Sequence, residues 1–372
     1  MNGTFRVGSL FGIPFYIHSS WFLVLGLVTW SYGSGLAAQF PGLVAPFPWL
    51  VGLFAALLLF TSVVAHELGH SLVALRQGID VKSITLFLFG GVARLEQESK
   101  TPAEAFWVAI AGPLVSLLLF GALTLLGIAT ANSGAFAAIV GLLASVNLAL
   151  ALFNLIPGLP LDGGNILKAL VWKLTGNRYK GVAFASRAGQ VLGWLAIASG
   201  LLPLVLFGSL GNFWNLLIGW FLLQNAGQIA QSAKVESKLS QFTAADAVSP
   251  ERPIVSAAMS LRQFADEQIM KPCSGHLVVD AAGQLLGKID LEDLRSVPTA
   301  YWSETQVGDV AKPVESSATV QADQPLLDVV KLLEQRKLSQ LFVVGANGVL
   351  VGLLEKASIL RLMQSGPAVR PA

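Results

Sequence analysis

Cysteine and charge are scarce in this sequence. The single cysteine, Cys273, excludes an internal disulfide and fits a reducing compartment, in which a buried thiol is its simplest state. Only 12% of the 372 residues are charged, and the formal net charge is +2. The sequence contains no run of basic residues, so neither its net charge nor its charge pattern indicates a nucleic-acid partner. Apolar residues make up 54% of the chain and the mean hydropathy is +0.65, so the composition is that of a membrane protein.

Long apolar segments dominate the first 230 residues, and each is long enough to cross a bilayer core of about 30 Å. They cover about 17–36, 49–75, 103–129, 136–155, 188–207 and 213–229. Basic residues occur only in alternate loops, and the positive-inside rule then places the N-terminus and everything after Ile229 in the cytoplasm. The sequence predicts an integral polytopic α-helical protein of the cell membrane with about six transmembrane helices.

Two short segments read as β-hairpins rather than as helices. Residues 1–18 alternate apolar and small side chains and are broken by glycine and proline, which favours a hairpin at the membrane interface. Residues 80–98 contain β-branched and aromatic side chains around Gly90 and Gly91, which favours two strands with a sharp bend.

An H-E-x-x-H motif lies inside the second apolar segment. If the segment is helical, His66 and His70 project from one face and can bind one metal ion. Glu67 can then reach a water at that metal and act as general base. The same motif on a soluble surface helix would most simply be a solvated polar turn, but ionisable groups at membrane depth are costly and usually functional. The motif therefore predicts a metal site on the cytoplasmic side of the bilayer midplane.

A hydrolytic zinc site normally takes three protein ligands, so one ligand is still missing. Asp162 is the only carboxylate between Glu104 and Glu236, and it follows an irregular Pro- and Gly-rich stretch at the same predicted depth. It is the predicted third ligand, the alternative being a cap of the helix that follows. Asn154 could stabilise an oxyanion or satisfy a helix end, and the sequence leaves these two readings level. His18 is expected to be an interfacial anchor, not a ligand.

Four motifs together resemble the site-2 protease family of intramembrane zinc metalloproteases. They are HELGH at 66–70, FGGVA at 89–93, AGPLVS at 111–116 and NLIPGLPLDGG at 154–164. The resemblance implies one zinc ion per chain bound by His66, His70 and Asp162. It also implies that Glu67 is the catalytic base and that Asn154 acts near the substrate carbonyl.

The same resemblance implies a substrate and a way of holding it. Single-pass membrane proteins, such as anti-sigma factors or membrane-tethered regulators, would be cut to release a cytosolic fragment. The membrane-associated hairpin of 84–95 could hold an unwound substrate by strand addition, or be purely structural. The chain has no room for the PDZ domain found in many bacterial members. A metal or ion transporter regulated by its C-terminal domain is the main alternative function, and a catalytically silent scaffold is a third.

A soluble region follows the membrane domain, which we assign to 1–230. After a linker at 231–245, the stretch His276–Gly287 aligns with Leu341–Gly352 at an offset of 65 residues. The arrangement resembles a tandem pair of cystathionine-β-synthase (CBS) domains at 246–366, with units at about 246–300 and 308–366, which would form an α/β module.

The CBS resemblance implies a regulatory module or a homodimer contact. In many proteins such a pair binds an adenine nucleotide between its repeats. Here Asp290 and Glu355 occupy positions where the family pattern has Thr, and Ser358 replaces an Asp that the first unit keeps as Asp293. Because additional carboxylates repel phosphate, the sequence favours regulation or dimerisation over ATP or AMP binding.

Overall fold

The chain is described from a computed structural model that covers residues 3–42, 44–87, 90–208, 212–249, 254–270, 275–313 and 318–365. The predicted buried thiol of Cys273, and Phe89 of the FGGVA motif, lie outside these residues. The chain divides into two compact units, 1–233 and 234–372, and this division falls within the predicted linker.

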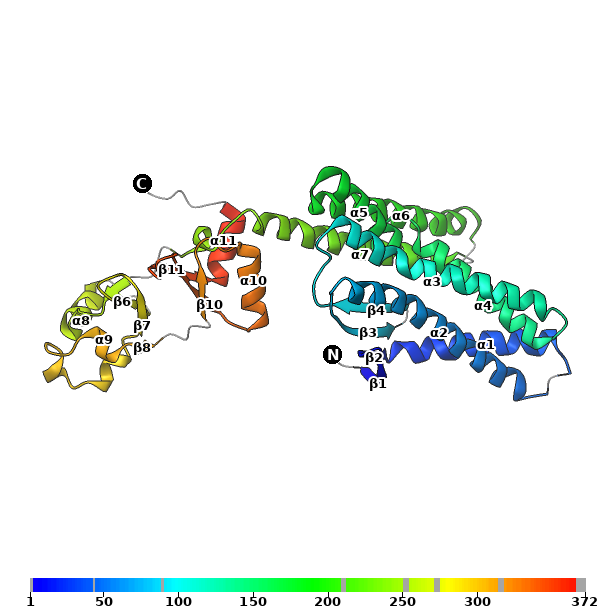
Figure 1. Ribbon diagram of the computed structural model, residues 1–372, viewed down its shortest axis with the longest axis horizontal. Coiled ribbons are helices and arrows are strands. Elements are labelled where there is room, and N and C mark those ends of the chain that lie inside the picture. Colours follow the sequence, from blue (N-terminus) through cyan, green and yellow to red (C-terminus); the bar gives the residue numbers. More distant parts are fainter. Residues whose placement is uncertain are drawn as a thin grey trace. The chain divides into compact units, whose positions relative to one another are not determined.

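The first unit is built on seven described helices (Figure 1). They are α1 Ser20–Gln39, α2 Phe47–Arg76, α3 Pro102–Ala129, α4 Ala135–Asn154, α5 Asp162–Thr175, α6 Arg178–Phe207 and α7 Phe213–Leu239. Within the described residues, α1, α2, α3, α4 and α6 are long and apolar enough to cross a membrane. The sixth predicted span, 213–229, lies within α7, where Gln224, Asn225 and Gln228 lower the hydropathy, and it stays a prediction.

Close contacts join α2 to its neighbours. A methyl group added at Gly69 of α2 would lie 2.9 Å from the backbone oxygen of Ala111 on α3, so only a small residue allows this approach. Seven residues earlier in α2, Ser62 Oγ accepts a hydrogen bond from Asn147 Nδ2 of α4 at 3.1 Å. Interhelical hydrogen bonds of this kind contribute about 0.6 kcal/mol on average. These contacts fix the part of α2 that carries the histidine motif.

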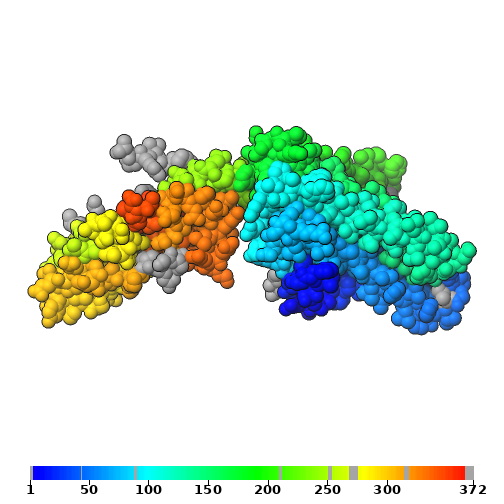
Figure 2. Space-filling view, viewed as in Figure 1, coloured from blue at the N-terminus to red at the C-terminus, as the bar shows by residue number. Residues whose placement is uncertain are grey.

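A four-stranded sheet packs against the C-terminal end of α2. Its strands are β1 Thr4–Leu10, β2 Ile13–His18, β3 Val81–Phe87 and β4 Gly90–Leu95, in the order β1-β2-β3-β4. Both predicted hairpins are confirmed as antiparallel pairs. The joining of the two hairpins into one sheet was not predicted. Strands β2 and β3 pair in parallel, with Phe15 opposite Ile84. In Figure 2 the dark-blue first hairpin lies directly beside the lighter-blue second one. As a result, β4 is an edge strand of this sheet.

The second unit contains two repeats, each of which begins with the order strand, helix, strand, strand. The first has β5 Ile254–Ser256, α8 Leu261–Met270, β6 His276–Val279, β7 Leu285–Ile289, three short helical turns from Asp293 to Val310 and β8 Lys312–Pro313. The second has β9 Thr319–Gln321, α10 Leu326–Gln335, β10 Gln340–Val344, β11 Leu350–Glu355 and α11 Lys356–Ser365. In each repeat the first strand pairs in parallel with the second, which forms an antiparallel hairpin with the third. Leu277 of one repeat and Phe342 of the other share a buried cluster, so the two repeats form one module.

Equivalent positions of the two repeats make equivalent bonds. The Asp293 carboxylate accepts a hydrogen bond from the backbone N–H of Asp290, and Ser358 Oγ accepts one from that of Glu355. Asp293 also forms an ion pair with Lys312 on β8. The Asp that the first repeat retains from the family pattern therefore has a structural role here.

Candidate metal centre

Two histidines of α2 face one another across a single helical turn. The residues from Trp49 to Ala65 are apolar or small and form an unbroken helix, which continues through the histidine motif. His66 and His70 therefore project from the same face, and their Nε2 atoms lie 3.3 Å apart. The side chain of His66 is only 3% exposed.

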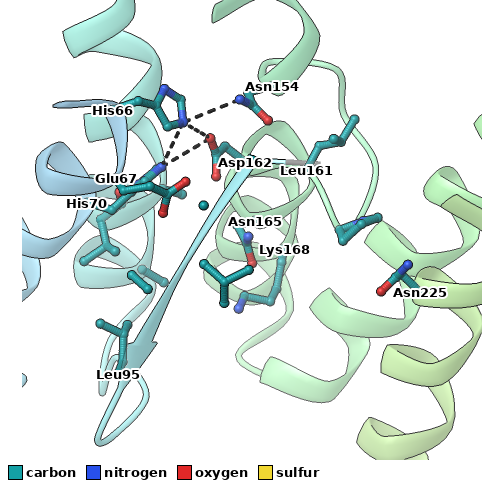
Figure 3. A pocket seen from close by; sticks show the side chains of 18 of the residues that line it. His66, Glu67, His70, Leu95, Asn154, Leu161, Asp162, Asn165, Lys168 and Asn225 are labelled. Atoms are coloured by element: carbon teal, nitrogen blue, oxygen red, sulfur yellow. Dashed lines mark hydrogen bonds and ion pairs between the residues drawn. The ribbon is translucent and has the colours of Figure 1, made fainter. Parts of the chain in front are cut away.

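Asp162 joins this pair from a distant part of the chain. The irregular segment after α4 ends at Leu161, and Asp162 begins α5. Its Oδ2 atom lies 3.1 Å from His66 Nε2 and 3.3 Å from His70 Nε2 (Figure 3). The N-cap position belongs to Leu161, so the alternative reading of Asp162 as the helix cap is not supported.

The three side chains form a donor set that suits zinc. Their ligand atoms all lie within 4.8 Å of one another. Nδ1 of His66 lies 2.9 Å from Ser116 Oγ, and Nδ1–H of His70 donates to the Val108 carbonyl oxygen at 2.7 Å. With both Nδ1 atoms engaged, each Nε2 lone pair is directed at the shared point, as in zinc sites with a supporting second layer of hydrogen bonds. Two imidazoles and one carboxylate leave room for water in a tetrahedral site.

Because Gly112 of α3 has no side chain, the rings of His66 and His70 can occupy the space beside it. A methyl group at this position would lie 2.2 Å from His70 Nε2 and 2.7 Å from His66 Nε2. Gly112 and Ser116 are one turn apart, so both face α2. The AGPLVS motif of the sequence thus contributes the floor of the metal centre and the hydrogen-bond partner of His66.

Glu67 lies between the histidines and the edge strand β4. The backbone of Ala93 is within hydrogen-bond reach of the Glu67 carboxylate. A methyl group at Gly91 would lie 2.4 Å from Glu67 Cγ, so β4 passes directly over this side chain. The strand therefore holds the candidate base in place beside the metal ligands.

Asn154 reaches the same centre from the last turn of α4. Its Nδ2 atom lies 3.4 Å from His66 Nε2, so the structure brings it together with the predicted ligands. His18 lies elsewhere: its Nδ1 atom is 2.8 Å from Ser20 Oγ and accepts from the Ser20 backbone N–H at 3.2 Å. His18 therefore anchors the start of α1 and is not among the metal-site residues.

A cavity of about 540 Å³ opens from the metal centre. Strand β4 and helix α5 lie on its two sides, and Asn154 and the three ligands are at one end. The cavity is also lined by Glu98, which follows β4, by Lys168 and Trp172 of α5, and by Arg178 of α6. The arrangement can bind a divalent metal, admit water and present a carboxylate base to it.

Sequence reasoning missed Ser116, Gly112 and Lys168. A serine or a glycine in an apolar helix is usually explained by packing or by a bond to its own backbone. The four-residue spacing of Gly112 and Ser116 was the one available indication that both belong to a single functional face. From the sequence, Lys168 is one of the basic residues between the fourth and fifth apolar segments and indicates only the orientation of the helices.

Replacing Ser116 with Ala should weaken zinc binding by about 10- to 100-fold, because His66 loses the partner that orients its ring. Zinc affinity is measured by competition with a chelator on the full-length protein in detergent. Ser145→Ala on α4 is the matched control, since Ser145 is exposed and bonds only the Gly141 carbonyl oxygen. Equal affinities in both variants and the wild type would refute this role of Ser116.

The chain matches known proteins over nearly its whole length. The family description Peptidase family M50 matches 54–132 and 121–196, and the CBS domain description matches 307–365. A protein of Synechocystis named as a zinc metalloprotease is 56% identical over 370 residues, covering 99% of this chain and 97% of the relative. A second, from Mycobacterium tuberculosis, is 35% identical and covers 98% and 93%. The solved site-2 protease from Methanocaldococcus jannaschii is 29% identical, covers 61% of this chain and 95% of that one, and has a TM-score of 0.42.

Proposed function

The chain belongs to peptidase family M50 and is an intramembrane zinc metalloprotease, and we propose the following roles for its residues in the reaction. His66, His70 and Asp162 hold one zinc ion, and Glu67 is the general base. The ligand atoms of these three side chains lie within 4.8 Å of one another, although His66 and Asp162 are 96 residues apart in the sequence. This convergence is the main support for the proposal. When bound, zinc supplies a Lewis acid that polarises the scissile carbonyl and acidifies water. The names of the relatives favour this function over the transporter alternative.

The side chains of this chain move the protons of the hydrolysis. Glu67 accepts a proton from the attacking water as its oxygen bonds to the carbonyl carbon. The protonated Glu67 then gives that proton to the amine nitrogen as the C–N bond breaks, which regenerates the carboxylate. Asn154 donates from its amide to the carbonyl oxygen while negative charge develops there. Its place at the centre supports this role over that of a helix-end partner.

The substrates are membrane proteins, and we propose that they are single-pass proteins cut to release a cytosolic fragment, such as anti-sigma factors or membrane-tethered regulators. The protein would lie in the cell membrane with its N-terminus and its C-terminal unit in the cytoplasm. Loops rich in Lys and Arg on one side of the helices support this orientation.

An extended substrate segment would add to the free edge of β4. An edge strand offers unpaired backbone groups to an incoming strand, and β4 is at the edge of its sheet. The contact of β4 with Glu67 supports this site, because a strand added there passes beside the base. The turn of the hairpin, Leu88 and Phe89, lies outside the described residues.

Replacing Gly91 with Ala should lower kcat/KM by about 10²-fold, because the new methyl group displaces Glu67 and misplacement of a catalytic group by about 1 Å has effects of this size. Zinc content should stay at the wild-type level, since the three atoms nearest the added methyl group all belong to Glu67 and none to a proposed ligand. Gly121→Ala on α3 is the control, because nothing lies within 4 Å of its added methyl group. Wild-type cleavage by Gly91→Ala would show that β4 does not position the base.

The domain boundaries we propose are 1–230 for the protease, 231–245 for the linker and 246–366 for the CBS pair, which regulates the protease or joins two copies. A cavity of about 130 Å³ lies between the two repeats, with Asp290, His276 and Lys288 in its lining. It is smaller than the about 300–1,000 Å³ of usual ligand pockets. The small size of this cavity gives no support to nucleotide binding there.

The metal dependence of cleavage tests the proposed function. Purified full-length protein in detergent should contain about one zinc per chain, as expected for a single three-ligand site. Chelation should abolish cleavage of a single-pass transmembrane peptide, and added zinc should restore it in proportion to the zinc bound. Cleavage that persists in zinc-free protein would reject the proposal.

A further inference from the structure

One face of α5 lines the active-site cavity. Asp162, Asn165, Lys168 and Trp172 follow one another at intervals of three or four residues, which places them on the same side of the helix. Figure 3 shows the Lys168 side chain extending from α5 toward the strand that carries Leu95. Both of these residues line the cavity. Lys168 thus faces the space beside the edge strand β4.

The charges in this part of the cavity do not balance. Of the charged residues that line it beyond the metal centre, Glu98 and Arg178 form an ion pair with each other. The half-buried Lys168 has no carboxylate within ion-pair distance among the residues that the structure describes. Glu98 attracts Lys168 only at longer range than its ion-pair contact with Arg178, so Lys168 has no close counter-charge among the described residues. A partly desolvated ammonium favours an anionic partner in contact with it.

We propose that Lys168 determines substrate specificity by binding an Asp or Glu side chain of the segment laid along β4. This inference rests on the proposed protease function and on strand addition at β4. Glu98 makes its close ion pair with Arg178, so Lys168 is not needed for that contact.

The helix geometry sets the position of the recognised residue. Lys168 follows Asp162 by six residues, which is about 9 Å along a helix axis at 1.5 Å per residue. An extended peptide advances about 3.3 Å per residue, so this distance corresponds to about three residues. The acidic side chain lies about three residues from the scissile bond, toward the Leu95 end of β4.

A set of transmembrane peptides tests the proposal with the full-length, zinc-loaded protein in liposomes of phosphatidylcholine, whose headgroup has no net charge. Each peptide has one Asp, Asn or Lys placed at successive positions on either side of the cut bond. The largest effect should occur when the varied residue is about three positions from the cut bond. There the wild-type protein should cleave the Asp peptide with about 10-fold higher kcat/KM than the Lys peptide, mainly because KM is lower. Lys168→Glu should reverse this preference, and Lys168→Met should remove the difference between Asp and Asn.

Lys173→Glu is the matched control, because Lys173 is exposed on the same helix and does not line the cavity. Peptide binding is also measured in Glu67→Gln with and without Lys168→Glu, which gives a readout without cleavage. An unchanged preference in Lys168→Glu would overturn the proposal while leaving the protease assignment intact. If the zinc-loaded wild type cuts no peptide, the proposed function itself fails and this inference fails with it.

Discussion

Replacing Glu67 with Gln is expected to lower kcat by about 10²- to 10⁴-fold, the usual contribution of a general base. The amide has nearly the same shape as the carboxylate but cannot accept the proton of the attacking water. The three proposed metal ligands are untouched, so the variant should keep about one zinc per chain. Zinc content and the rate of peptide cleavage are measured on the same preparation of the full-length protein.

Glu96→Gln is the control for this substitution. Glu96 is close in sequence to β4 but is half exposed, forms an ion pair with Lys82 and does not line the cavity. Its variant should cleave like the wild type. If Glu67→Gln retained wild-type activity with its zinc in place, the base would have to be another group.

Replacing Gly112 with Ala is expected to abolish zinc binding and cleavage together. The added methyl group would overlap the Nε2 atoms of both His66 and His70, which are the atoms that would bind the metal. Alanine is more favourable than glycine inside a helix by about 1 kcal/mol, so α3 itself should not be weakened. A loss of zinc would therefore report the steric conflict and not a loss of helix.

The check on Gly112 is zinc content by elemental analysis, with circular dichroism to compare helix content. Gly121→Ala on the same helix is the control, since open space surrounds that position. A Gly112→Ala protein with full zinc and full activity would contradict the placement of α3 against the histidines.

Local patterns in the sequence predicted much of the metal centre. The four-residue spacing of His66 and His70 is sufficient to place both on one helical face, whatever the rest of the fold does. Asp162 could be assigned because no other carboxylate lies between Glu104 and Glu236. The assignment therefore needed no knowledge of where α5 lies relative to α2. The structure brings these three side chains together at the expected place.

Features that depend on contacts between distant segments were not predicted. The parallel pairing of β2 with β3 joins strands separated by α1 and α2, and no local pattern specifies such a register. The role of Ser116 depends on how α3 packs on α2, and the exposure of Lys168 to the cavity depends on how α5 is turned.

The proposed centre of His66, His70 and Asp162 should cut a peptide bond that lies inside the membrane. The most direct test is the intact mass of the products formed from a single-pass substrate in liposomes by zinc-loaded wild type and by Asp162→Asn. The wild type should give two fragments whose junction lies within the transmembrane helix. Asp162→Asn should give neither fragment and should also lack zinc. Identical fragments from both proteins, or a cut confined to the soluble flanks of the substrate, would contradict it.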